Sequence, residues 1–113
     1  IKSPHRQQGN LSDAAERGKK LFADAGCAVC HSGKWLTDLK GYDVGTGTGM
    51  DRAKPMDTPT LIEVWRSAPY LHDGRAATLL DVLKKCNPDD RHGQTVGLTD
   101  HQLRDLVEYL LSQ

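Results

Sequence analysis

The sequence predicts an all-α fold of four to five helices in one domain. Amphipathic segments with capping residues recur along its 113 residues, and no segment alternates polar and apolar side chains as a strand does. A chain of this length suits a single hydrophobic core. We interpret residues 1–10 as a flexible lead-in or linker and residues 11–113 as the domain.

The first helix is expected to begin after Ser12, with Asp13 and Glu16 in its first turn, where acidic residues favour helix formation. Gly26 is well placed to end it. Small and apolar residues recur between these points at helical spacing and would form its buried face: Ala14, Gly18, Leu21, Phe22 and Ala25.

The middle of the chain alternates loops with short helical patterns. Residues 40–55 contain four glycines among polar residues, which indicates a long loop. A domain this small rarely has such a loop unless the loop has a function, and covering a cofactor is one. Thr58 and Pro59 predict the start of a short helix, and Thr78 predicts another.

The last helix has the clearest local signal. Thr99 and Gln102 form a capping-box pair. Leucine and valine residues then follow at intervals of three and four as far as Leu111, so one face of this helix is apolar.

Composition and charge exclude several functions. Fifteen basic and fifteen acidic side chains cancel, whereas nucleic-acid binding usually requires a basic excess. No apolar run approaches the roughly 18 residues of a membrane span. Only 37% of the residues are hydrophobic and 5% aromatic, so this chain would gain much from enclosing a large apolar cofactor.

Residues 27–31 form a C-x-x-C-H motif, the pattern of c-type haem attachment. Two thiols at this spacing can each form a thioether with one vinyl group of a porphyrin, and the adjacent histidine then faces the iron. A structural zinc site would need more ligands, and thioredoxin-like chemistry would need a βαβ setting. An ordinary disulfide is a further alternative. We predict one covalent haem on Cys27 and Cys30, with His31 as the proximal ligand.

The first helix with Gly18 and Phe22, the C-x-x-C-H motif and the leucine-rich last helix together resemble the class I cytochromes c. That resemblance implies a cytochrome c fold around one haem. In this family the first and last helices cross closely, which implies that Gly18 and Phe22 meet the last helix near Leu106, Tyr109 or Leu110.

A second resemblance covers residues 57–79. The stretches Asp57-Thr58-Pro59-Thr60-Leu61 and Ala68-Pro69-Tyr70-Leu71-His72-Asp73-Gly74-Arg75, followed by Thr78-Leu79, are similar to the C-terminal haem domain of bacterial di-haem cytochrome c peroxidases. It implies a structural or haem-pocket role for His72. Those enzymes divide their work between two haems, whereas this chain has one haem motif.

Three residues are candidates for the distal ligand of the iron. In class I cytochromes it comes from the loop before the last helix, which here contains Cys86 and His92 but no methionine. The peroxidase resemblance also places its ligand position at Cys86. We favour His92, with Cys86 second and Met56 third; an open or water-bound iron is a further alternative.

Four aromatic rings and one arginine are further predicted haem contacts. The rings would pack against the porphyrin, and the guanidinium would pair with a propionate. A structural role without haem contact suits the tryptophans and the tyrosine equally well. The residues are Phe22, Trp35, Trp65, Tyr70 and Arg75.

The favoured function is single-electron transfer, without catalysis, to a redox partner protein or a fused domain. The alternatives are a peroxidase-type enzyme with an open or openable sixth site, and a haem module of a larger protein. Covalent haem attachment implies maturation outside the cytoplasm, so the expected location is the bacterial periplasm or another extracytoplasmic site.

Overall fold

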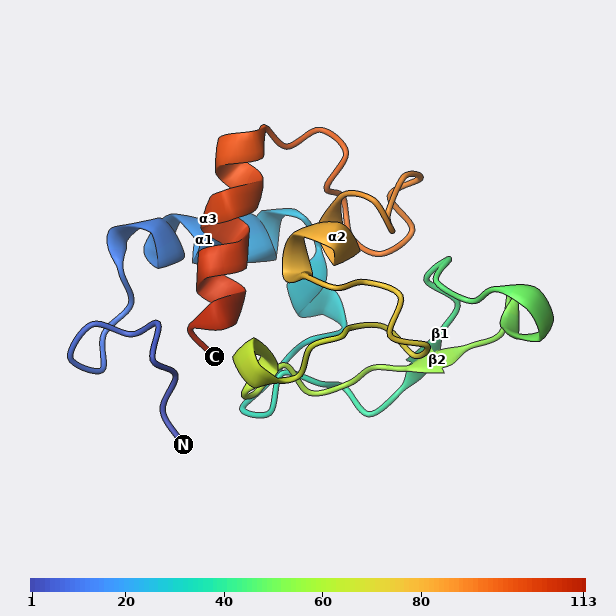
Figure 1. The fold of residues 1–113 in the computed structure, drawn as a ribbon, viewed down its shortest axis with the longest axis horizontal. Coiled ribbons are helices and arrows are strands. Elements are labelled where there is room, and N and C mark those ends of the chain that lie inside the picture. Colours follow the sequence, from blue (N-terminus) through green and yellow to red (C-terminus); the bar gives the residue numbers. More distant parts are fainter.

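The structure, a computed structural model, describes residues 1–113. Helices α1 and α3 cross at a steep angle, and a two-stranded antiparallel sheet lies on the far side of the short helix α2 (Figure 1). No helix combines the length and hydropathy needed to span a membrane. The elements are α1 (Asp13–Asp24), β1 (Gly41–Tyr42), β2 (Met56–Asp57), α2 (Leu79–Leu83), α3 (Asp100–Leu111) and three 3₁₀ turns (Cys27–Val29, Gly49–Asp51, Val64–Arg66).

The fold is mostly helical, but the all-α prediction is wrong in detail. The two ends of the glycine-rich loop pair as strands, with Gly41 opposite Asp57 and Tyr42 opposite Met56. Because the loop returns antiparallel to its start, the backbone groups at its two ends can satisfy one another. Three α-helices form in place of the four to five expected.

The helix predicted after Thr58 does not form. The carbonyl of Thr58 accepts a hydrogen bond from Thr37 Oγ1 (2.6 Å), and Thr60 Oγ1 donates to the carbonyl of Trp35 (2.5 Å). These contacts tie the segment to residues 35–37. Glu63 then takes a left-handed conformation (φ 60°), so only a 3₁₀ turn follows.

The predicted caps of the other helices are confirmed. Ser12 accepts a hydrogen bond from the N–H of Ala15 at the start of α1. Thr99 and Gln102 form the expected capping box of α3, and Thr78 forms another with Asp81 at the start of α2. These signals involve residues only three positions apart, and so they can be predicted from local sequence.

The core is built on the contact between α1 and α3. A side-chain carbon at Gly18 would lie 1.9 Å from the carbonyl oxygen of Asp105 and 2.8 Å from Tyr109 Cβ, so only glycine permits this crossing. The rings of Phe22 and Tyr109 lie next to it, with centroids 5.2 Å apart. The crossing expected from the cytochrome c resemblance is therefore present.

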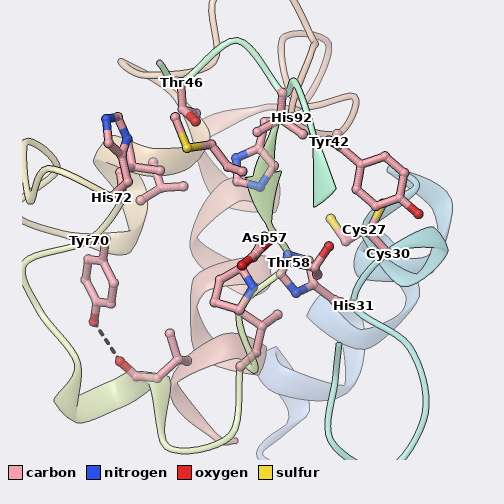
Figure 2. A pocket seen from close by; sticks show the side chains of 18 of the residues that line it. Cys27, Cys30, His31, Tyr42, Thr46, Asp57, Thr58, Tyr70, His72 and His92 are labelled. Carbon is pink, nitrogen blue, oxygen red and sulfur yellow. Dashed lines mark hydrogen bonds between the residues drawn. The ribbon is translucent and has the colours of Figure 1, made fainter. Parts of the chain in front are cut away.

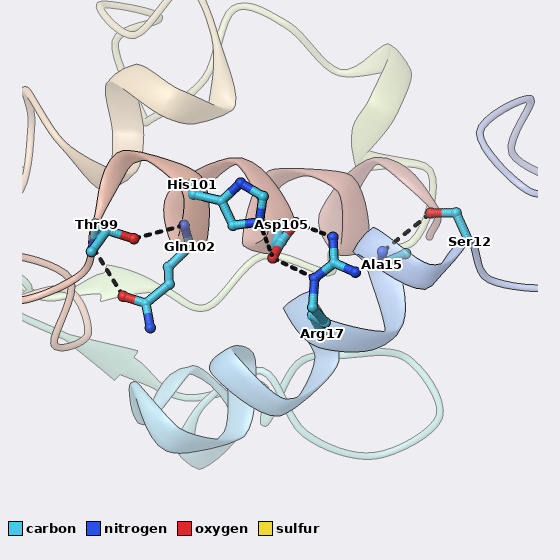
Figure 3. A network of polar contacts seen from close by, with 7 residues as sticks. All are labelled: Ser12, Ala15, Arg17, Thr99, His101, Gln102 and Asp105. Atoms are coloured by element: carbon cyan, nitrogen blue, oxygen red, sulfur yellow. Dashed lines mark hydrogen bonds and ion pairs between the residues drawn. The ribbon is translucent and has the colours of Figure 1, made fainter.

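A polar brace lies beside this crossing (Figure 3). Arg17 donates to both carboxylate oxygens of Asp105 at 2.8 and 3.1 Å, and His101 Nε2 lies 3.6 Å from the same carboxylate. Asp105 is buried, so this bidentate pair provides most of its hydrogen bonding.

Residues 1–10, predicted as a flexible lead-in, contact the end of α3. Ser3 Oγ donates to the carbonyl of Leu111 (2.5 Å), and Arg6 Nε donates to the carbonyl of Ser112 (2.7 Å). The last turn of α3 contains no basic residue of its own. Arg6 therefore supplies a cation where the helix dipole is negative.

We expect Gly18→Ala to lower the free energy of unfolding by about 3 kcal/mol or more, because the added methyl forces two backbones apart. Thermal or urea unfolding measures this loss. Gly97→Ala is the matched control, since no atom lies within 4 Å of its added carbon. Equal stability of the two variants would contradict the close crossing.

We expect Asp105→Asn to weaken the dependence of stability on acidic pH. The hydrogen bond from Arg17 lowers the pKa of Asp105. Its ionised form therefore adds stability that is present above the unfolded pKa of about 4 and is lost as pH falls through the folded pKa. Unfolding midpoints of parent and variant between pH 2 and 7 should converge at the acidic end. A constant difference over this range would refute the assignment.

Candidate haem site

The wall of the main cavity comes from segments of the chain that lie between α1 and α3. The cavity has a volume of about 560 Å³, within the usual range for cofactor sites of about 300–1,000 Å³. The C-x-x-C-H segment, both strands, residues 58–61, residues 69–72, α2 and residues 91–93 contribute to it. Long loops therefore enclose a space that the few core side chains do not fill.

His31 is oriented toward the cavity by its backbone partner. Its Nδ1 lies 3.1 Å from the carbonyl oxygen of Leu36. A carbonyl can only accept, so Nδ1 carries the proton and Nε2 keeps a free lone pair. Burial lowers the pKa of His31. The neutral imidazole is thus the stable form near neutral pH, as a metal ligand requires.

His92 faces His31 across the cavity (Figure 2). Their ring centroids are 6.4 Å apart, and the ring planes are inclined at 48°. A metal–imidazole bond is about 2 Å long, so two imidazoles on opposite sides of one metal have centroids about 6 Å apart. Burial, followed by the proximity of His31, lowers the pKa of His92. The spacing of the two rings and the lowered pKa of each would suit two residues that hold one metal ion between them.

Cys27 and Cys30 lie together at one side of the histidine pair, whereas Tyr70 and His72 lie at the other (Figure 2). Both cysteines are free thiols, and burial raises the pKa of Cys27 to about 11. No three His, Cys, Asp or Glu side chains cluster so as to hold a bare metal ion. The thiols beside one imidazole and the second imidazole opposite fit a porphyrin better than zinc.

The structure divides the other predicted site residues into two groups. Met56 and Tyr70 line the cavity, and Tyr70 donates its hydroxyl to the carbonyl of Val64 (2.9 Å). The second group is absent from the cavity wall and consists of Phe22, Trp35, Trp65, Arg75 and Cys86.

The surroundings of four of these five residues account for their positions. Phe22 packs against Tyr109 in the core, and Trp35 is 61% exposed. Arg75 donates to the carbonyl of Thr46 (2.7 Å). The backbone N–H of Cys86 bonds to Asp81, and its side chain is not part of the wall.

Several residues of the cavity wall were not predicted as site residues from the sequence. Tyr42, Val44 and Thr46 come from the glycine-rich loop, and Leu61 and Val64 come from the segment mispredicted as a helix. The only signal for the first group is the unusual length of the loop, which indicates a covering role without naming the residues that provide it.

The cavity, the paired imidazoles and the adjacent thiols define the attachment site of a c-type haem protein. The chain belongs to the cytochrome c family, whose model, described as "Cytochrome c", matches residues 15–113. The family assignment implies covalently bound haem c, which these residues fit.

Known relatives agree with both resemblances. The gamma subunit of hydrazine synthase from Kuenenia stuttgartiensis is 34% identical over 96% of this chain and 43% of its own length. A solved structure of that organism's hydrazine synthase superposes with a TM-score of 0.90 at 32% identity, covering 100% of this chain and 50% of the other. The cytochrome-c peroxidase IdrP1 of Denitromonas iodatirespirans is 27% identical over 88% and 40% of the two chains. This chain spans less than half the length of these curated relatives.

We expect the double variant Cys27→Ser/Cys30→Ser to lose covalent haem, because no thiol remains beside His31 to form a thioether. Haem staining after denaturing electrophoresis measures the attachment. Cys86→Ser is the control and should keep its stain, since Cys86 lies outside the cavity wall. Haem that stayed attached in the double variant would contradict the site.

Proposed function

We propose that this domain transfers single electrons through one haem c held by His31 and His92. The observation that supports this most directly is the pair of imidazoles that face each other with ring centroids 6.4 Å apart. Two strong protein ligands leave no coordination position for a substrate. Two histidines that stay in place would need little rearrangement when the charge changes, and the chain would tune the potential by ligand type, burial and hydrogen bonding.

The chain's own residues would perform three tasks. The carbonyl of Leu36 keeps the Nδ1 proton of His31 and so fixes which nitrogen binds the metal. Leu61, Val64 and Leu79 line the cavity with apolar surface that excludes water. Cys27 and Cys30 would anchor the porphyrin edge, so that oxidation and reduction leave it in place. The haem itself supplies the redox change.

The peroxidase alternative requires a sixth position that is open or can be opened. His92 in the cavity argues against it, and Met56 and Cys86 rank behind His92 as distal ligands. Met56 does line the cavity, whereas Cys86 does not.

A carrier of single electrons needs a donor and an acceptor, and we propose that these are a redox partner protein or a fused domain. Since covalent haem attachment takes place outside the cytoplasm, we place the mature domain in the periplasm or another extracytoplasmic compartment.

We expect the oxidised haem protein to be low-spin and six-coordinate, and His92→Ala to become high-spin while keeping its covalent haem. Absorption and electron paramagnetic resonance spectra measure this change. Met56→Ala, at another residue of the same wall, should remain low-spin. A high-spin parent would refute the two-histidine assignment and favour the peroxidase alternative.

A further inference from the structure

Asn87 lies beneath the loop that carries His92. It is 2% exposed and follows α2 by a few residues. Its Nδ2 lies within hydrogen-bond distance of the carbonyls of His92 (3.1 Å) and Gly93 (2.9 Å) and of Thr95 Oγ1 (2.8 Å). Its Oδ1 accepts from the backbone N–H of His92 (2.9 Å). One buried side chain thus binds the backbone of His92 on both sides of its Cα.

The same loop is anchored at its far end. Thr95 Oγ1 donates to the carbonyl of Leu83 in α2 (2.6 Å). Asp90 Oδ1 accepts from the N–H groups of Thr95 and Val96, both at 2.8 Å. The far end of the loop is therefore held in place without Asn87. The contacts of Asn87 hold the part of the loop that carries the imidazole.

A third contact joins the loop to the C-x-x-C-H segment. The N–H of Gln94 donates to the carbonyl of Ala25 (2.8 Å). Gly93 has φ +79°, and a side-chain carbon there would lie 3.4 Å from the Ala25 oxygen and 3.6 Å from Cys27 Sγ. The backbone beside His92 is thus fixed against Ala25, two positions before Cys27.

The geometry points to Asn87 as the positioning residue of the distal ligand, an inference that rests on His92 being that ligand. Asn87 is not part of the cavity wall, but it holds the peptide groups before and after His92. Groups that orient a metal ligand commonly affect affinity by large factors. Without Asn87 the His92 loop would open more often, and an external ligand would replace the imidazole sooner.

The test measures the rate at which cyanide replaces the distal ligand of the oxidised haem protein, which requires the iron–imidazole bond to break first. Asn87→Ala removes all four contacts, and Asn87→Asp keeps the side-chain volume and the acceptor for the His92 N–H. We expect cyanide to bind at least about tenfold faster in both variants, because several hydrogen bonds of modest strength are lost together and the loop then opens more often.

Asp105→Asn is the control, because it also weakens the hydrogen bonds of a buried polar side chain but lies at the α1–α3 crossing. It should lower the unfolding midpoint and leave the cyanide rate near that of the parent. Rates in the Asn87 variants that match this control at equal loss of stability would overturn the inference. So would failure of both Asn87 variants to accumulate haem protein while Asp105→Asn does.

The His92→Ala spectrum separates the two proposals. If His92→Ala leaves the spin state unchanged, the ligand assignment fails and the inference about Asn87 fails with it. If His92→Ala becomes high-spin while the Asn87 variants keep the parent's cyanide rate, only the inference about Asn87 is refuted.

Discussion

The close approach of α1 and α3 at Gly18 is the constraint on which the rest of the structure depends. Backbone contact there fixes the direction in which α1 ends, and Gly26 turns the chain directly into the C-x-x-C-H segment. The position of His31, which ends that segment, therefore depends on helix packing. The position of His92 depends on α2 and its hydrogen-bonded loop, which connect to the same end of α1 through Ala25.

This arrangement separates a dense part of the molecule from a hollow one. The helices and their aromatic pair form a small core, and loops form most of the wall of the cavity. With only 5% aromatic residues, the chain has few bulky side chains that could fill this cavity. The apolar interior that a domain of this size needs is completed when a large flat cofactor enters the cavity.

The elements that the sequence could predict are those whose signals lie within a few residues. The caps at Ser12, Thr78 and Thr99 and the C-x-x-C-H spacing are of this kind. The helix predicted after Thr58 does not form, because hydrogen bonds to residues 35–37, which are distant in sequence, outweigh the local helix signal. Asn87 also escaped notice, since an asparagine before a proline indicates the end of a helix, and its contacts with His92 depend on the tertiary path of the loop.

The contacts of Ser3 and Arg6 with the end of α3 limit how far the domain can be shortened at its N-terminal side. Ser3 and Arg6 bond to the carbonyls of Leu111 and Ser112, which the helix itself leaves without a partner. A shorter chain beginning at the first obvious helix would leave those carbonyls exposed and remove the cation at that end. Ser3 and Arg6 therefore pack as part of the folded domain, and a linker joined to this module needs to leave both residues in place.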